Sequence, residues 1–158
     1  MEKARNAKEP HAGEKPISAK AVGMTVTYAY QNGDTFKIHG KHPVRDNNPG
    51  NVISGPIARK NGSISRDGRF AIFATAQDGW GALNDLLTKT YVSKKLDDVI
   101  VLYAPPTENK TAHYQQEVSK LTGIPGDTVL AKLDRIQVNK LMAVIGRLEG
   151  WKGEAYAQ

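Results

Sequence analysis

Apolar and polar residues alternate between Met24 and Gly40, on both sides of the pair Asn32-Gly33. A period of two is typical of half-buried strands, and Asn-Gly between two such runs is a strong hairpin signal. Two further turn signals and an apolar run follow, at Asn61-Gly62, Asp67-Gly68 and Phe70–Phe73. This part of the chain therefore predicts a small, irregular sheet.

From Asp78 onward the apolar period becomes that of helices. One helical face of the first such segment collects Trp80, Leu83, Leu86, Leu87 and Tyr91. Helices are also predicted over residues 96–104, which Pro105-Pro106 ends, and over 111–121. Residues 128–150 predict one broken helix or two adjacent ones. A small β part followed by helices indicates an α+β fold.

The chain of 158 residues suits one domain with a sizeable core. Residues 1–21 are rich in Lys, Glu, Ala and Pro and have little to bury, so they predict a disordered tail or linker ahead of a domain at 22–158. This segment lacks the apolar region of a secretory signal. No later stretch is long enough to predict a membrane span.

Composition narrows the chemistry. Cysteine is absent, which excludes disulfides and thiolate catalysis. His39 and His42 are close in sequence, but no ligand spacing is completed around them, so we expect surface histidines and no metal site. No organic cofactor is implied. The net charge of +6 suits nucleic acid, anionic lipid or the bacterial cell wall. Because the cations are scattered and no nucleic-acid motif accompanies them, we expect no nucleic acid.

The stretch RDNNPGN, residues 45–51, is rich in amides and contains nothing apolar. Two interpretations are open. Asn, Pro and Gly form turns, and the stretch could serve only as one. Alternatively, fixed amides that donate and accept hydrogen bonds could line a cleft and hold a carbohydrate. The second interpretation assigns substrate contacts to Arg45, Asn47, Asn48 and Asn51.

The stretch YAPPTENKTAHY, residues 103–114, places Glu108 just after two prolines and before a helix. An acid at a helix start is ordinary helix-entry chemistry, because the helix dipole favours it. The competing interpretation is a catalytic carboxylate on a stiff stem, with substrate contacts from Tyr103, Asn109 and Tyr114.

The stretch RLEGWKG places Glu149 at the end of a strongly amphipathic helix, next to Trp151. The helix dipole disfavours an acid at this end. Glu149 could be an exposed residue of the last turn. It could also be a general acid, which must hold its proton near neutral pH, with Trp151 contacting substrate.

These stretches in this order resemble a family of phage-encoded and bacterial proteins with lysozyme-like character. That family has an R-x-NNPGN loop, an F-x-x-F strand, a helix with Gly-x-x-Ala and an A-P-P-[ST]-E-N-D-T segment. The order is also similar to that of bacterial glucosaminidases. The resemblance covers residues 44–153 and implies a lysozyme-like α+β fold with a small sheet and a mainly helical part.

The chain departs from lysozyme-like enzymes in one respect. There, the catalytic Glu ends a helix that precedes the asparagine loop, whereas here a hairpin without Glu precedes Arg45. The stretch LMAVIGRLEGWKG resembles that helix, which implies a circularly permuted order. A circular permutation requires little change in the fold, because the termini of a domain often lie close together. Lys110 stands where the family has Asp, so an acidic role at that position is in doubt.

The resemblance implies a peptidoglycan glycan-strand hydrolase, either a muramidase or a lytic transglycosylase. Glu149 would be the general acid and Glu108 a second carboxylate, or the reverse. The implied partners are peptidoglycan and a cognate immunity or inhibitor protein. Action in the periplasm or at the wall, without a signal peptide, implies delivery by phage or a dedicated secretion route. The alternatives are a non-catalytic wall-binding or virion structural module and, more weakly, a nucleic-acid-binding domain.

Overall fold

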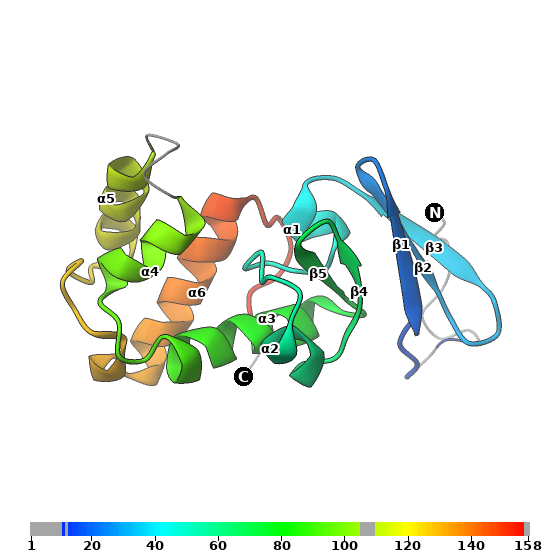
Figure 1. The fold of residues 1–158 in the computed structure, drawn as a ribbon, viewed down its shortest axis with the longest axis horizontal. Helices are drawn as coiled ribbons and strands as arrows, with labels where there is room; N and C mark the ends of the chain where they lie inside the picture. The colour runs from blue at the N-terminus through cyan, green and yellow to red at the C-terminus, as the bar shows by residue number, and fades with distance from the viewer. Residues whose placement is uncertain (1–10, 12, 105–109, 157–158) are drawn as a thin grey trace. The chain divides into compact units, whose positions relative to one another are not determined.

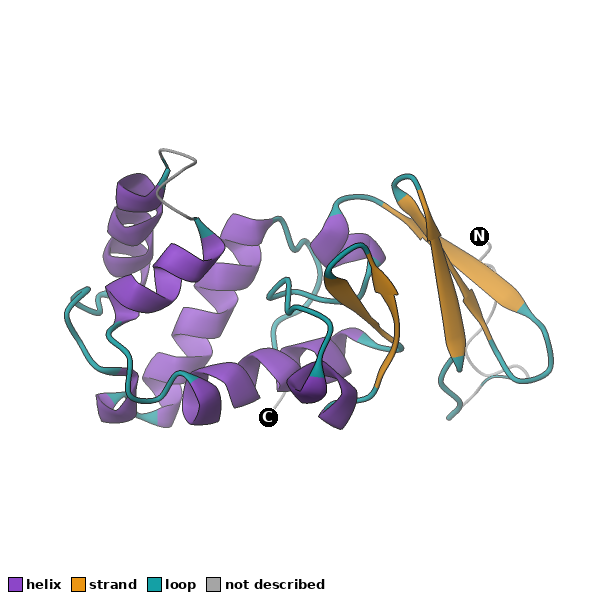
Figure 2. Ribbon diagram, viewed as in Figure 1, coloured by secondary structure: helices purple, strands orange, loops and turns teal. Residues whose placement is uncertain are grey.

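The computed structural model describes residues 11, 13–104 and 110–156. The fold is α+β: its strands lie between residues 18 and 73, and helices prevail after residue 76 (Figures 1 and 2). The chain divides into two compact units. Unit 1 contains Met1–Ala82 and Gly146–Gln158, and unit 2 contains Leu83–Ile145. None of the described helices is both long and apolar enough to cross a membrane.

Unit 1 begins with a three-stranded antiparallel sheet in the order β1-β2-β3. Its strands are β1 (Ser18–Val22), β2 (Thr25–Ala29) and β3 (Thr35–His39). A second hairpin pairs β4 (Ser63–Asp67) with β5 (Phe70–Phe73). The inner face of the sheet packs on this hairpin through a buried cluster of Val26, Tyr28 and Ile72, flanked by Ala19, Ala21, Phe36, Ile38 and Ile64.

Two short helices of unit 1 lie between β3 and β4. They are α1 (His42–Arg45) and α2 (Pro56–Lys60), and both have proline in the first turn, where its missing N–H costs nothing. The turn that follows α1 runs to Asn51 and is the amide-rich stretch of the sequence. We call residues Arg45–Asn51 the asparagine turn.

The remaining helices are amphipathic. Helix α3 (Ala76–Asp85) continues into the π-helical turn η1 (Leu86–Thr90), and α4 (Leu96–Tyr103) and α5 (Thr111–Thr122) follow in unit 2. The 3-10 turn η3 (Leu130–Lys132) precedes α6 (Arg135–Glu149). The buried apolar residues of unit 2 include Leu83, Leu87, Leu96, Val99, Ile100, Val118, Leu130, Val138, Leu141, Met142 and Ile145.

Most predicted elements are confirmed: the hairpin around Asn32-Gly33, the strand Phe70–Phe73 and the helices α3 to α6. The last segment is η3 followed by one unbroken helix. The strand β1 and the short helices α1 and α2 were not predicted. The interpretation of residues 1–21 as a tail does not hold for residues 18–21, because they pair with β2 as part of β1. Residues 1–10 and 12 lie outside the described part.

Candidate active site

The asparagine turn is held against β5 by the side chain of Asn48, which is fully buried. Its Nδ2 donates to the carbonyls of Val52 and Ala71, each at 2.9 Å, and its Oδ1 accepts from the Val52 N–H at 2.8 Å. All of the hydrogen-bonding groups of this side chain therefore serve the backbone around it. Asn48 shapes the turn and is not placed to bind a substrate, in contrast to the predicted role.

Asn47 also ties the turn to β5. Its backbone is left-handed, with φ of 51°, a conformation that asparagine tolerates better than most residues. Its Nδ2 lies 3.2 Å from the Phe73 carbonyl and 3.3 Å from that of Ala74. Asn47 thus anchors the turn too, and its contact with substrate stays a prediction.

Asn51 differs from both, because its amide points to the far end of the sequence. Its Nδ2 donates to Oε1 of Glu149 at 2.8 Å, across 98 residues of chain. Asn51 is left-handed as well, with φ of 48°. Among the described residues, these two asparagines are the only non-glycine residues with positive φ. Backbone strain of this kind concentrates at functional sites.

Glu149 is the last residue of α6, and the chain reverses directly after it. Gly150 takes the left-handed conformation that ends many helices, with φ of 113°, and Trp151 N donates to the Gly146 carbonyl at 2.8 Å. The Trp151 ring meets Trp80 edge-on, with centroids 6.1 Å apart. Both indole N–H groups donate to the Glu154 carbonyl. Glu149 is therefore carried by a fixed helix end.

Glycine at position 79 lets the asparagine turn approach α3, and glycine at position 146 lets the Trp80 ring approach α6. A Cβ at Gly79 would lie 2.2 Å from the Asn47 carbonyl oxygen, and a Cβ at Gly146 would lie 2.7 Å from the Trp80 ring and 3.6 Å from the Pro49 oxygen. No side chain fits at either position without displacing its neighbours. Gly79 thus permits the close approach of the turn that carries Asn51, and Gly146 permits the packing of Trp80 on the helix that carries Glu149.

Beside the turn lies a cluster of ionisable side chains, His42, Arg45, Asp46 and Asp67, which we call the charge cluster. Arg45 Nε donates to Asp67 at 2.7 Å, and Arg45 Nη1 donates to the Gly40 carbonyl at 3.0 Å. His42 Nδ1 lies 2.9 Å from Asp46 Oδ2. Arg45 is buried, so it supports the turn from inside, and the predicted substrate contact is not available to it.

The two acids of this cluster have pKa values shifted in opposite directions by burial, hydrogen bonds and neighbouring charges. Burial raises the pKa of Asp46 to about 9, and the hydrogen bond and negative charge of Asp67 act in the same direction. For Asp67, burial alone would raise the pKa, but hydrogen bonds from Arg45 and Asp46 outweigh it and lower the pKa below the usual range. Asp46 therefore holds a proton at neutral pH while Asp67 is ionised. Burial and Arg45 lower the pKa of His42.

Ligand atoms of His42, Asp46 and Asp67 lie within 4.8 Å of one another, a spacing that a metal ion could bridge. However, Arg45 already supplies the compensating positive charge, and its Nη2 lies 3.1 Å from Nε2 of His42. These groups form a hydrogen-bonded network, in which Asp46 Oδ1 is buried without a partner among the described residues. His42 is half-buried in it and is not the surface histidine that the sequence predicts.

The other predicted site residues divide between the two units. Trp151 is half-buried and supports the helix end in unit 1. Tyr103 and Tyr114 belong to unit 2, where their rings stack with centroids 6.2 Å apart. Glu108 and Asn109 lie outside the described residues. The sequence analysis missed Gly79, Gly146 and the charge cluster, although glycine inside a helical pattern is a known signal for close packing.

No protein-family model, no curated protein and no solved structure matches this chain. Its function therefore has to be inferred from its own residues and contacts.

Proposed function

We propose that the protein cleaves the glycan strands of peptidoglycan, as a muramidase or lytic transglycosylase of lysozyme-like fold, with Glu149 as the general acid. The observation that supports this most is the hydrogen bond from Asn51 Nδ2 to Glu149 Oε1 at 2.8 Å. It joins the two motifs whose order in the sequence is permuted relative to lysozyme-like enzymes. Such a contact, 98 residues apart in the chain, is what a shared catalytic site requires.

In the proposed reaction, protonated Glu149 gives its proton to the glycosidic oxygen as the bond from that oxygen to the anomeric carbon breaks. The sugar passes through an oxocarbenium-like state. Water then attacks the anomeric carbon in a hydrolase, or a hydroxyl of the same sugar does so in a transglycosylase, and the proton released returns to Glu149. The amide of Asn51 holds the carboxyl in one orientation, which favours a productive approach.

Glu108 remains the candidate for the second carboxylate, and it would stabilise the oxocarbenium-like state or act as a base. Paired carboxylates are usual in glycosidases. The proposed place of action is the periplasm or the cell wall, reached by phage or by a dedicated secretion route. A producing cell would then need a cognate immunity or inhibitor protein.

The test is Glu149→Gln, assayed for clearing of purified peptidoglycan. Gln matches the carboxyl in shape but cannot give up a proton, and general acids contribute about 10²–10⁴-fold. Glu154→Gln is the matched control: it makes the same charge change on an exposed side chain five residues away, and only its backbone carbonyl is used by the fold. Circular dichroism should show that both variants are folded.

A parental rate from Glu149→Gln would remove Glu149 as the acid, and Glu108→Gln would then be the next variant. If the parent protein itself binds the wall but releases no glycan fragments, the enzyme proposal fails. The non-catalytic wall-binding module would then replace it.

A further inference from the structure

The positive charge of this protein is concentrated in one stretch of sequence. Residues 13–75 contain nine Lys and Arg but only four Asp and Glu, whereas residues 76–158 contain ten of each. The expectation of scattered cations is therefore wrong for the strand-forming part of unit 1. A local excess of this kind creates a surface potential that attracts anions.

The four acids of this stretch are already engaged with partners of their own. Asp46 and Asp67 are buried in the charge cluster. Glu14 and Asp34 both hydrogen-bond to the buried His11, at 3.2 Å and 2.8 Å. The cations on the strands, in contrast, are exposed, and none of them is ion-paired with a described acid. The net charge of the segment therefore appears at its surface.

The register of the sheet places these cations on one side. One face of β1-β2-β3 packs inward, and the other face points to solvent. Lys20 pairs with Thr27, and Thr27 pairs with Lys37, so the three side chains form one row across the outward face. Strand spacing puts the ends of this row about 10 Å apart. Hydroxyls, His39 and the small apolar residues Val22 and Ala29 surround it, giving what we call the cationic face: Ser18, Lys20, Val22, Thr25, Thr27, Ala29, Thr35, Lys37 and His39.

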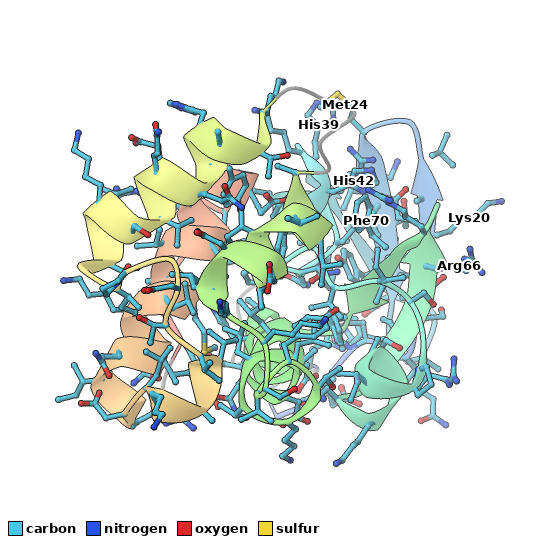
Figure 3. The ribbon with its side chains drawn as sticks, turned by 60° about the vertical axis from the view of Figure 1, so that its left-hand side comes forward. Lys20, Met24, His39, His42, Arg66 and Phe70 are labelled. Atoms are coloured by element: carbon cyan, nitrogen blue, oxygen red, sulfur yellow. The ribbon has the colours of Figure 1, made fainter. Side chains whose placement is uncertain are left out.

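Further cations in the same unit border this face. Strand β1 lies against β4, and Figure 3 shows Lys20 and Arg66 at the same edge of unit 1, with Met24 and His39 at the β1–β2 end. Lys41 follows β3, and its side chain lies against Gly150, next to Glu149. Positive charge thus reaches from the sheet to the end of α6 that carries the candidate acid.

We propose that the cationic face binds the peptidoglycan meshwork through carboxylates of its peptide stems and holds the insoluble polymer while Glu149 acts on a glycan strand. The choice of peptidoglycan as the bound polymer rests on the proposed function, whereas the cationic character of the face rests on the sequence and the strand register alone. Lysine is a compact charge on a flexible stem and suits carboxylates at variable positions. The face carries no aromatic side chain on which bases could stack, which disfavours single-stranded nucleic acid.

The first experiment measures binding without cleavage, in the Glu149→Gln background, by sedimentation with purified peptidoglycan. Lys20→Glu with Lys37→Glu should reduce wall affinity about tenfold at low salt, since exposed ion pairs are individually weak but two are reversed together. Lys132→Glu with Lys140→Glu changes the net charge equally on exposed residues of unit 2 and should leave binding unchanged. Lys20→Gln with Lys37→Gln, which adds no negative charge, should give an intermediate loss.

Binding by the parent should weaken as salt rises from 0.1 M toward 1 M, because screening shortens the reach of exposed charges from about 10 Å to about 3 Å. Equal wall binding by the two Glu pairs would overturn the proposal. It would also be overturned if the Lys20/Lys37 pair bound wall normally but lost binding to DNA or to anionic lipid vesicles, because the face would then serve another polyanion.

A second measurement separates this proposal from the proposed function. With Glu149 intact, Lys20→Glu with Lys37→Glu should cleave short, soluble glycan fragments at the parental kcat, while its KM on intact wall rises about tenfold. If Glu149→Gln cleaves as well as the parent, the assignment of the acid fails while the binding result still stands. If the Glu pair loses kcat on short fragments too, the cationic face belongs to the catalytic site and the anchoring role is wrong.

Discussion

The three asparagines of the turn carry out different tasks with the same side-chain chemistry. Asn48 and Asn47 direct their amides to backbone carbonyls of the turn and of the residues from Ala71 to Ala74. Asn51 directs its amide to a carboxylate. Replacing each one should therefore affect a different property, stability for the first two and catalysis for the third.

Asn51→Ala should reduce wall cleavage about tenfold to a hundredfold, because a hydrogen bond to a charged group is worth about 1.5–3 kcal/mol. The loss should be in kcat, because the amide orients the carboxyl that gives up the proton. Steady-state kinetics on soluble fragments provide the measurement. An unchanged kcat with reduced thermal stability would make Asn51 a structural residue only.

Asn48→Ala should instead destabilise the fold by about 1–3 kcal/mol, because it leaves the buried Val52 N–H without a partner and removes one hydrogen bond from each of the Val52 and Ala71 carbonyls. Urea unfolding measures this directly, and the surviving folded fraction should cleave normally. The exposed Asn32 in the β2–β3 turn offers a comparison, because Asn32→Ala removes only two local, exposed hydrogen bonds to Asp34, one from its N–H and one to its carboxylate. Equal midpoints for the two variants would contradict the structural role of Asn48.

For the two acids of the charge cluster, Asp46 and Asp67, we predict opposite effects of pH on the stability of the fold. The folded pKa of Asp46 is raised to about 9, so its contribution to stability is full below pH 4 and is lost as pH rises through about 9. Asp46→Asn should therefore gain stability relative to the parent between pH 5 and pH 9. The folded pKa of Asp67 is lowered, so its contribution is present above pH 4 and is lost on acidification.

Asp67→Asn should consequently cost stability at neutral pH, by about 3–5 kcal/mol, because Arg45 then stays buried without its carboxylate. Urea titrations of both variants at pH 5, 7 and 9 test the pair. Asp98→Asn, on an exposed residue of α4, controls for loss of charge alone. If Asp46→Asn followed the same pH trend as the parent, Asp46 would not be protonated in the folded protein.

At the scale of the elements, the turn can lie close to α3 because that helix has no side chain at Gly79. Gly79→Ala would force a Cβ to 2.2 Å from a backbone oxygen of Asn47, which cannot rotate away. Overpacking of this kind costs about 1–3 kcal/mol, and it should also displace Asn51 from Glu149. We expect lower stability and lower activity together.

Gly55→Ala is the matched control for this helix contact, because a Cβ there meets nothing within 4 Å and the backbone is extended. Thermal unfolding and wall clearing of the two variants should be measured side by side. Normal activity from Gly79→Ala would mean that the asparagine turn does not depend on its close approach to α3.

The elements were predictable where local pattern and tertiary packing agree. Strand β3 alternates clearly, whereas the sequence of β1, SAKAV, has small and charged residues with low strand propensity. It becomes a strand because Ala19 and Ala21 pack on the core next to β2. The site could be predicted only in part for the same reason. The composition of the asparagine turn does not indicate which side-chain amide donates to a backbone carbonyl and which donates to Glu149.

At the scale of the whole molecule, residues 18–22, just ahead of β2, belong to the folded sheet. Deleting residues 1–21 should lower the melting temperature by several degrees, since about 1 kcal/mol corresponds to roughly 2–4 °C at this size and the deletion uncovers β2 and the core beneath it. A chain beginning at His11 keeps β1 and the His11 contacts and provides the baseline. Equal melting temperatures would restore the interpretation of residues 1–21 as a tail.

Because unit 1 combines Met1–Ala82 with Gly146–Gln158, the order of translation decides when it can be completed. Asn51 leaves the ribosome 98 residues before Glu149, an interval of roughly 5–20 s at about 5–20 residues per second. Throughout that time Asn51 has no Glu149 to bind. Under the proposed mechanism, an unfinished polypeptide is therefore catalytically silent, and activity begins only when the end of α6 has been synthesised.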